Sequence, residues 1–300
     1  MTGKAASTGK AAGYLRLLRP AHWIKNGFVF APLVYSLSVA RPGPLLAVLL
    51  AFVSFCLAAS ASYVLNDLLD HRTDREHPRK RHRPIASGAV SVRGAAAAAA
   101  LLIAAGSAVA AVSGLPVLIV VLVYFLWNLL YSTYLKKMVI LDVLAIAGGF
   151  LLRVIAGAAA AGVAISQWML LVTFFLALFL GFSKRRTELH VLEGNTTHRS
   201  VLERYSPSLL NALMVSTASL TIVTYSLYVA APQTAERLTT GWLIYTVPLV
   251  VFGLFRYLYV VHERVNGDDI VDILVHDLPI LLDILLWGAA TIVILYGGWA

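Results

Sequence analysis

The chain contains little charge and only one cysteine. Of its 300 residues, 13% are charged and 59% are hydrophobic, and the mean hydropathy is +0.80. Soluble domains carry about 25% charged residues, so this composition excludes an ordinary soluble domain. The single cysteine, Cys56, cannot form a disulfide bond within the chain, and it gives no information about the redox compartment.

The beginning of the chain lacks the apolar stretch of a secretory signal peptide. Residues 1–20 are mainly small or charged, so we predict that no signal peptide is cleaved. We expect residues 1–12 to form a disordered tail. No linker separates two domains, and we therefore expect residues 13–300 to form a single transmembrane domain.

The hydrophobic residues gather in long runs. Most of the runs contain about 18 residues or more, which is enough for a helix to cross roughly 30 Å of hydrocarbon. They lack the polar faces that the helices of a soluble protein need, so we predict an all-α integral membrane protein, a bundle of about nine transmembrane helices. The first run is the weakest, because it is short and contains Pro32. The nine runs are 27–42, 44–65, 94–113, 115–133, 139–161, 166–183, 208–231, 240–262 and 279–299.

The basic residues predict the orientation of this bundle. Twenty of the 24 Lys and Arg residues lie in the N-terminal segment or in loops that follow an even-numbered run. Loops rich in Lys and Arg stay on the cytoplasmic side of a membrane. We therefore predict a multi-pass protein of the cytoplasmic membrane whose N-terminus and charged loops face the cytoplasm. Long polar loops after the second and sixth runs also hint at two halves of four helices each.

The most highly charged loop follows the second run. Residues 63–88, YVLNDLLDHRTDREHPRKRHRPIASG, hold four carboxylates and six Lys or Arg residues. Asn66, Asp70 and Asp74 follow one another at intervals of four residues, which places their side chains along one face of a helix. Such oxygen ligands suit Mg²⁺, which usually keeps some coordination positions for water or phosphate.

The basic residues of the same loop indicate which further ligand such an ion would bind. Arg79, Lys80, Arg81 and Arg83 follow the acidic residues closely, and guanidinium groups bind phosphate oxygens in a forked geometry. The loop therefore predicts a site for Mg²⁺ and a diphosphate. The alternative is a solvated loop in which acidic residues offset basic ones.

This loop resembles the first aspartate-rich motif of the UbiA superfamily of intramembrane prenyltransferases. The resemblance implies a UbiA-like bundle of nine helices, with a cytoplasmic-side site for Mg²⁺ and diphosphate and a tunnel that faces the lipid. The matching segments are Asn66-Asp67-x-x-Asp70-x-x-x-Asp74, Arg79, Arg83-Pro84-Ile85-Ala86-Ser87-Gly88, Tyr131-Ser132-x-x-Leu135-Lys136-Lys137, Leu141-Asp142-Val143 and Gly149-Phe150-x-Leu152-Arg153.

The loop after the sixth run departs from the pattern of that superfamily. Typical members carry a second aspartate-rich motif there, which helps to bind a second metal ion. This chain instead has Ser183-Lys184-Arg185-Arg186-Thr187-Glu188-Leu189, with one carboxylate among three cations. Such a loop suits an anion better than a second Mg²⁺, and it favours substrates with more phosphate than a single prenyl diphosphate.

Together with this loop, the N-terminal segment resembles the decaprenyl-phosphate phosphoribosyltransferase branch of the superfamily. The resemblance implies transfer of 5-phosphoribose from phosphoribosyl diphosphate (PRPP) to a polyprenyl (decaprenyl) monophosphate, for the synthesis of cell-wall arabinan precursors. It also implies a homo-oligomer, a trimer. The N-terminal residues are Leu17-Leu18-Arg19-Pro20-x-x-Trp23-x-Lys25-Asn26 and Val29-Phe30-Ala31-Pro32-Leu33.

The expected reaction requires no nucleophilic side chain or general base, because the lipid phosphate is already ionised at neutral pH. Mg²⁺ and the arginines would stabilise charge on the diphosphate, and the phosphate would attack C1 with inversion. Lys136 and Lys137 have the alternative of simple anchoring at the membrane surface. The expected catalytic residues are Asn66, Asp70, Asp74 and Arg83, and the first three would bind the metal. The expected substrate-binding residues are Lys25, Asp67, Arg79, Arg83, Tyr131, Lys136, Lys184, Arg185, Arg186 and Glu188.

Other charged residues have structural and functional interpretations. Arg153 lies inside the fifth run, where it either reaches the active site or pairs with an internal acid or carbonyl; we favour the structural role. Arg256 is expected to extend its charge to the membrane surface. The acidic residues near the last charged loop have three open interpretations, namely a ribose or metal contact, a lid, or a solvated loop. They are Asp268, Asp269, Asp272, Asp277 and Asp283.

Three competing functions remain to be weighed. A prenyltransferase that moves a prenyl group from a prenyl diphosphate to an aromatic acceptor would share the first motif, but it would need more acidic residues after the sixth run. A transporter or channel would need polar residues inside the runs, which offer almost none besides Arg153. Nucleic-acid binding is not expected, because the predicted topology explains the basic pI of 9.7.

Overall fold

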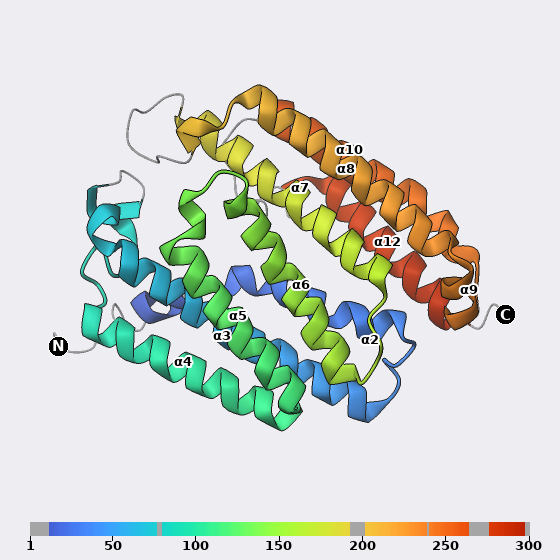
Figure 1. The fold of residues 1–300 in the computed structure, drawn as a ribbon, viewed down its shortest axis with the longest axis horizontal. Helices are drawn as coiled ribbons and strands as arrows, with labels where there is room; N and C mark the ends of the chain where they lie inside the picture. Colours follow the sequence, from blue (N-terminus) through green and yellow to red (C-terminus); the bar gives the residue numbers. More distant parts are fainter. Residues whose placement is uncertain (1–11, 77–79, 193–201, 239, 264–275, 298–300) are drawn as a thin grey trace. The chain divides into compact units, whose positions relative to one another are not determined.

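A computed structural model describes the chain except for residues 1–11, 77–79, 193–201, 239, 264–275 and 298–300 (Figure 1). Helices dominate the described residues, in which no strand occurs. Residues 12–18 are helical. The further elements are η1 (Pro20–Phe30), α2 (Ala31–Tyr35), α3 (Pro42–Glu76), η2 (Lys80–His82), α4 (Val92–Ser113), α5 (Leu115–Thr133), η3 (Leu135–Lys137), α6 (Leu141–Ala161), α7 (Gln167–Leu192), η4 (Leu202–Arg204), α8 (Pro207–Ala230), α9 (Pro232–Leu238), η5 (Trp242–Thr246), α10 (Val247–Glu263) and α12 (Leu278–Tyr296), where η denotes a 3₁₀ helix.

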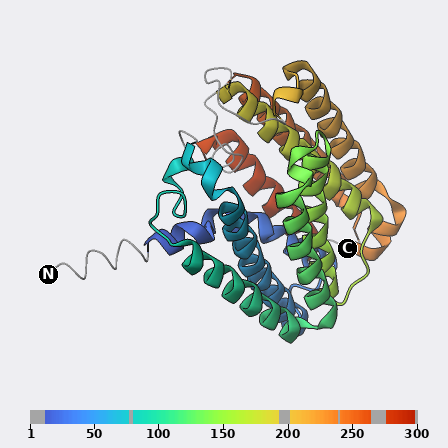
Figure 2. The same cartoon turned by 60° about the vertical axis from the view of Figure 1, so that its left-hand side comes forward.

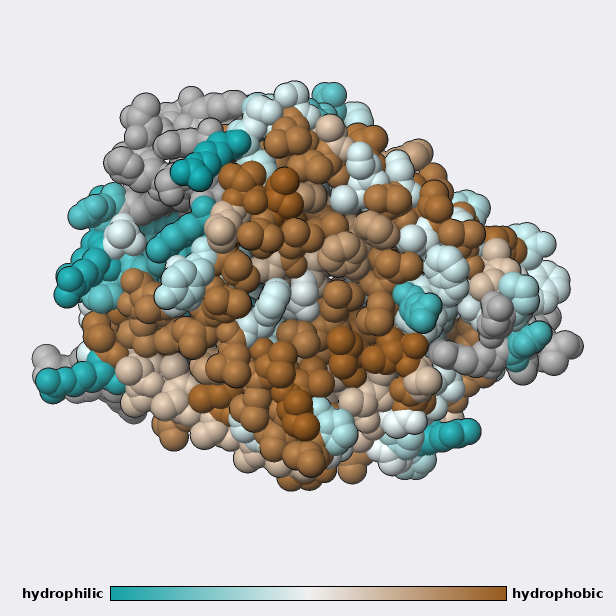
Figure 3. All heavy atoms as spheres, in the orientation of Figure 1, coloured by the Kyte–Doolittle hydropathy of each residue, from teal (hydrophilic) through white to brown (hydrophobic). Residues whose placement is uncertain are grey.

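Eight helical segments of the described chain are long and apolar enough to cross a membrane. Many of their apolar side chains point outward: the exposed fraction is 71% for Leu101, 77% for Val112 and 67% for Leu115. Hydrophobic residues cover most of the face shown in Figure 3. Such an extended apolar surface is unfavourable in water but favourable in the hydrocarbon core of a lipid bilayer. The predicted all-α membrane bundle is thus confirmed.

The first predicted run, 27–42, does not form a spanning helix of its own. The structure divides this region between the 3₁₀ segment η1 and the short helix α2. Arg19 and Leu37, which flank these two elements, adopt positive φ angles of 49° and 56°, a conformation that interrupts a right-handed helix. Eight of the nine predicted runs therefore correspond to the spanning segments.

Local sequence signals set several helix boundaries. Ser91 caps α4 by accepting a hydrogen bond from the backbone N–H of Gly94. Gly114 ends α4 with a φ of 136°, and a proline stands in the first turn of α5. Ser206 and Asp277 cap α8 and α12 in the same way as Ser91 caps α4. Such caps satisfy backbone N–H groups that have no partner within the helix.

The chain packs as two compact units. Unit 1 contains 1–30, 42–135 and 152–162, and unit 2 contains 31–41, 136–151 and 163–300. The boundary falls inside α6, so that this helix contributes to both units. The expected division into a disordered tail and a single domain stays a prediction, since residues 1–11 lie outside the described part of the chain.

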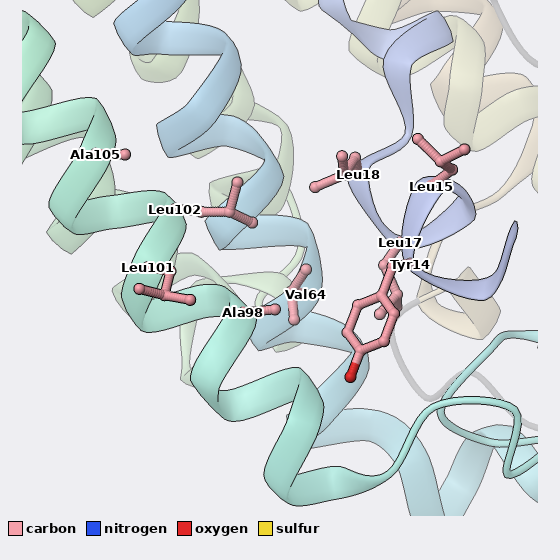
Figure 4. A pocket seen from close by; sticks show the side chains of 9 residues that line it. All are labelled: Tyr14, Leu15, Leu17, Leu18, Val64, Ala98, Leu101, Leu102 and Ala105. Atoms are coloured by element: carbon pink, nitrogen blue, oxygen red, sulfur yellow. The ribbon is translucent and has the colours of Figure 1, made fainter. Parts of the chain in front are cut away.

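In unit 1, helix α3 lies alongside α4 and also packs on α5 and η1 (Figures 1 and 2). Ser54 donates a hydrogen bond of 2.7 Å to the carbonyl oxygen of Gly106, at a point where α3 and α4 approach closely. The N-terminal helical residues face the other end of this pair. Figure 4 shows Tyr14, Leu17 and Leu18 opposite Val64 and the alanines of α4, around an apolar pocket of about 360 Å³.

In unit 2, α7 packs on α8, and α10 packs on both α8 and α12. Tyr225 joins three elements of this unit. Its hydroxyl is 2.6 Å from Oγ1 of Thr246 in η5, and it accepts a hydrogen bond of 3.0 Å from the indole N–H of Trp287 in α12. These bonds satisfy polar groups that would otherwise be buried among apolar side chains.

Gly157 supplies a stability test for unit 1. A Cβ atom at this position of α6 would overlap the carbonyl oxygen of Val29 in η1. We expect Gly157→Ala to lower the free energy of unfolding by about 1–3 kcal/mol, because the added methyl group overpacks the contact. Gly288→Ala in α12 is the matched control, since no atom lies within 4 Å of its Cβ position. Thermal unfolding in detergent, followed by fluorescence, measures both; an unchanged midpoint for Gly157→Ala would contradict the close approach.

Candidate functional site

Helix α3 is much longer than a membrane is thick. Its 35 residues span about 52 Å at 1.5 Å per residue, whereas the hydrocarbon core is about 30 Å thick. The apolar part ends near residue 65, and the helix continues to Glu76. Asn66, Asp70 and Asp74 lie on this continuation, as predicted, and their spacing places them along one side of it.

Arg83 joins two buried carboxylates on this part of α3. Its Nη1 donates hydrogen bonds to Oδ1 of Asp67 at 3.0 Å and to Oδ2 of Asp74 at 2.7 Å. Asp67 and Asp74 are only 2% and 3% exposed. A buried carboxylate is stable only when its charge is compensated, so Arg83 is an integral part of this cluster rather than a free loop cation.

The backbone after η2 brings Arg83 to the helix. The N–H of Ser87 binds the carbonyl oxygen of Arg83 at 2.8 Å, and the N–H of Val90 binds that of Pro84 at 2.9 Å. This compact turn buries Ile85 against Leu17 and Val64. The predicted motif Arg83–Gly88 is therefore a structural turn that fixes the direction of the Arg83 side chain.

Arg19 is a member of the cluster that sequence analysis did not assign to the site. Its Nη2 donates a hydrogen bond of 2.6 Å to Oδ1 of Asp67, and its guanidinium lies 5.1 Å from the ring centre of Tyr63. The only indication in the sequence was the position of Arg19 in the N-terminal motif, directly before Pro20. Asp67 thus binds two arginines, and its expected contact with a substrate stays a prediction.

The donor set on α3 fits a hard divalent cation. The two ion-paired carboxylates each use a single oxygen for their arginines, which leaves Oδ1 of Asp74 for another ligand, beside the half-buried Asn66 and Asp70. In the described part of the chain, no three His, Cys, Asp or Glu side chains gather around one point. Mg²⁺ held here would therefore complete its shell with the Asn66 amide and with water or phosphate oxygens. Arg79 lies outside the described residues.

A second polar cluster lies in unit 2, where α7 meets the start of α6. Arg185 is 6% exposed, and it binds Oδ2 of Asp142 and Oε2 of Glu188, each at 2.6 Å. The Tyr205 hydroxyl donates to Oδ1 of Asp142 at 2.8 Å and accepts from the N–H of Ile140 at 2.6 Å. Burial raises the pKa of Tyr205, and Asp142 raises it further. The phenol therefore remains a donor at neutral pH.

The remaining predicted substrate-binding residues divide between the two units. Lys25 in η1 and Tyr131 in α5 are half-buried members of unit 1, and Lys136 in η3 is a half-buried member of unit 2. Lys184 makes no hydrogen bond or ion pair through its side chain with the described residues. Arg186 donates to Oδ1 of Asn211 at 3.1 Å. The three cations of this segment of α7 thus differ, since among the described residues only Arg185 pairs with carboxylates.

Arg153 makes contacts that agree with the structural role we favoured. It is 5% exposed, and it donates to Oδ1 of Asn26 at 2.7 Å and to the hydroxyl of Tyr124 at 2.9 Å. Its guanidinium also lies 4.8 Å from the ring centre of Tyr124. Asn26 is completely buried, so Arg153 ties η1 to α5 and α6 within unit 1.

Arg256 makes two hydrogen bonds to Asp277, of 3.2 and 3.0 Å. The expectation that it extends its charge to the membrane surface stays a prediction. Asp277 also caps α12, so this pair stabilises a helix end. Asp283 is buried within α12. The other acidic residues of this group, Asp268, Asp269 and Asp272, lie outside the described residues.

The fold and these clusters define an all-helical membrane protein with a polar site at the end of a long apolar helix. Carboxylate and guanidinium groups form that site. A model of the UbiA prenyltransferase family matches residues 28–272. The chain belongs to this family.

Three relatives that bear the name decaprenyl-phosphate phosphoribosyltransferase are similar over most of the chain. The protein of Corynebacterium glutamicum is 37% identical over 73% of this chain and 67% of its own length. The protein of Mycolicibacterium smegmatis is 34% identical over 86% and 84%, and that of Mycobacterium tuberculosis is 31% identical over 93% and 92%.

A solved structure shows the same fold. The UbiA homologue from Archaeoglobus fulgidus, bound to GPP and Mg²⁺, aligns with a TM-score of 0.72 over 94% of this chain and 99% of its own chain, at 20% identity. The predicted UbiA-like architecture is therefore confirmed.

Arg185 provides a test of the cluster in unit 2. Arg185→Met leaves the completely buried Asp142 without its guanidinium partner, and we expect a loss of about 3–5 kcal/mol in unfolding free energy. Thermal unfolding in detergent measures the loss. Lys184→Met is the matched control and should change the midpoint little. The double variant Arg185→Met/Asp142→Asn should recover part of the stability; no recovery would contradict the assigned pairing.

Proposed function

We propose that the chain transfers 5-phosphoribose from PRPP to a polyprenyl monophosphate such as decaprenyl phosphate and releases diphosphate. Three relatives with 31–37% identity bear the name of this activity. Family membership supports a polyprenyl substrate and a site at the membrane surface. The product would be a lipid-linked phosphoribose, a precursor for cell-wall arabinan.

The pairing of Arg185 with two carboxylates is the observation that favours this reaction over prenyl transfer. Two described carboxylates near the end of α7, those of Asp142 and Glu188, are bound to its guanidinium at 2.6 Å. They are therefore committed to a cation of the chain itself, while Lys184 and Arg186 add positive charge to the same helix. Such a segment attracts anions. PRPP and a lipid phosphate together bring four phosphoryl groups, whereas prenyl transfer to an aromatic acceptor brings only the two of a single diphosphate.

The residues of α3 and its neighbouring turn would stabilise the leaving group. Mg²⁺ held by Asn66, Asp70 and Asp74 would supply positive charge to the diphosphate of PRPP. Asp67 and Asp74 hold the Arg83 guanidinium in a fixed place, and its remaining N–H groups can donate to diphosphate oxygens. A charge that is fixed before the reaction needs no reorganisation as the C1–O bond lengthens.

The remaining predicted residues would bind the other phosphate groups. Lys136, Lys184 and Arg186 are the residues for the ribose 5-phosphate or the lipid phosphate, and Lys25 and Tyr131 are further residues for substrate contacts. A phosphate oxygen of the lipid forms the new bond to C1 while the bond from C1 to the diphosphate breaks, with inversion. The attacking oxygen carries no proton, so no side chain has to remove one.

The location and assembly of the protein complete the proposal. The basic loops favour a cytoplasmic location for the N-terminus and for the charged ends of the helices, and a soluble phosphorylated sugar would be available there. We extend the proposal to a homotrimer in the cytoplasmic membrane, on the resemblance to the family.

A substrate comparison tests the proposed function. Purified protein in detergent receives labelled PRPP and decaprenyl phosphate in one reaction, and a prenyl diphosphate with 4-hydroxybenzoate in another. We expect labelled lipid only in the first reaction, and we expect EDTA to abolish its formation until Mg²⁺ is restored. Prenylation of the aromatic acid without any phosphoribosyl transfer would reverse the assignment.

The acidic residues of α3 supply a second test. Asp70→Ala and Asp74→Ala should each reduce turnover by at least about 100-fold, since both remove stabilisation of the transition state. Glu76→Ala, an exposed acid on the last turn of the same helix, is the matched control and should keep normal turnover. Circular dichroism and gel filtration establish that the variants fold. Unchanged activity in Asp70→Ala would remove the metal site from the proposal.

A further inference from the structure

The backbone is strained at Ile140, the residue directly before α6. Its φ angle is 69°, which lies in the left-handed region that a branched side chain rarely adopts. The side chain is 42% exposed, so it gains little from burial in return. Such strain persists only where the surrounding structure holds the backbone in place. The turn before α6 therefore needs a partner that keeps Ile140 in this conformation.

The hydroxyl of Tyr205 is that partner. The backbone N–H of Ile140 donates a hydrogen bond of 2.6 Å to it, and the hydroxyl itself donates to Oδ1 of Asp142 at 2.8 Å. Burial raises the pKa of Tyr205, so the phenol keeps its single proton at neutral pH. The carboxylate can only accept this proton, which leaves the lone pairs of the phenol oxygen for Ile140. The directions of both hydrogen bonds are thus fixed.

Tyr205 is anchored on elements outside the turn. It is 3% exposed and lies between η4 and α8, where its backbone N–H donates to the carbonyl oxygen of Leu202 at 3.1 Å. Asp142 is bound in turn to Arg185 of α7 at 2.6 Å. The turn before α6 is therefore fastened to α7 and to the start of α8, and all of these residues belong to unit 2.

The same turn carries Lys136, one of the cations proposed for a phosphate group. Lys136 lies in η3, four residues before Ile140. The backbone between them is weakly held by packing, since Met138 is 50% exposed. A positive φ at residue 140 sends the preceding chain in a different direction from a negative one. The conformation of Ile140 thus determines where Lys136 lies relative to α6 and α7.

We propose that Tyr205 is a positioning residue, which holds Ile140 in its strained conformation and thereby places Lys136 for a phosphate monoester. The inference rests on the proposed function, in which this group is the 5-phosphate of PRPP or the phosphate of the polyprenyl acceptor. Both are phosphate monoesters. Tyr205 contacts neither substrate, and it acts through the backbone of the turn.

Steady-state kinetics with each substrate varied separately test this role. Tyr205→Phe removes the hydroxyl, and we expect the KM for one of the two substrates to rise about ten-fold while kcat changes by less than about two-fold, because uniform binding is lost. The substrate whose KM rises identifies the phosphate. Tyr225→Phe is the matched control, since it also removes a hydroxyl with two hydrogen bonds in unit 2; both of its KM values should stay normal.

A double-mutant cycle establishes whether Tyr205 acts through Lys136. Lys136→Met should raise the same KM by at least as much as Tyr205→Phe. The double variant should then be no worse than Lys136→Met alone, because the hydroxyl has no cation left to place. Effects that multiply would show that Tyr205 acts independently of Lys136, and they would overturn the proposal.

Substitutions of Ile140 separate the conformation of the turn from the stability of the cluster. Glycine adopts a positive φ without strain, so Tyr205→Phe/Ile140→Gly should recover most of the normal KM; no recovery would contradict the proposal. Ile140→Pro fixes φ near about −65° and should reproduce the rise in KM, although Tyr205 can still bind Asp142. This exposed substitution keeps the test decisive if Tyr205→Phe does not fold.

The same experiments distinguish the failure of this inference from that of the proposed function. A wild-type chain without any phosphoribosyl transfer would remove the proposed function, and with it the phosphate that Lys136 would bind. Normal transfer by the wild type, together with unchanged KM values in Tyr205→Phe and Ile140→Pro, would overturn the positioning role alone.

Discussion

The polar end of unit 1 depends on one guanidinium group that two buried carboxylates share. Asp67 and Asp74 lie seven residues apart on α3, so they project from the same side of the helix, and Nη1 of Arg83 binds both. Without this bond the two charges would be buried with less compensation, at a cost of several kcal/mol. The bond also fixes the loop that follows η2, and it therefore decides where the positive charge next to the acidic side of α3 lies.

Unit 2 repeats this principle with different residues. Arg185 lies between Asp142 and Glu188 as Arg83 lies between Asp67 and Asp74. In each unit, arginines are committed to internal carboxylates, Arg19 and Arg83 in unit 1 and Arg185 in unit 2, whereas Lys184 forms no ion pair with the described residues. A count of charges along the sequence cannot distinguish these two kinds of cation. The distinction matters chemically, because a cation that is already paired with internal carboxylates brings less net positive charge to a phosphate group than an unpaired cation does.

The sequence predicted those features that depend on local periodicity. The long apolar runs identified eight spanning segments, and intervals of four residues placed Asn66, Asp70 and Asp74 on one side of α3, since both follow from helix geometry alone. Pro32 correctly marked the weak first run. Features that depend on distant contacts were missed: Asp142 lies 43 positions from Arg185, and Asn26 lies 127 positions from Arg153. No pattern within the KRRTEL segment indicated that its middle cation is buried.

The continuity of α3 links the position of the polar cluster to the thickness of the bilayer. The membrane-spanning residues and the acidic residues belong to one continuous helix of 35 residues. The two parts therefore cannot move independently. A thicker or thinner membrane must therefore tilt the helix or deform the lipid around it, at a modest cost for each Å of mismatch. Either response moves Asn66, Asp70 and Asp74 relative to the headgroup layer. Lipid chain length is thus a physical variable to which the chemistry at the end of this helix is directly exposed.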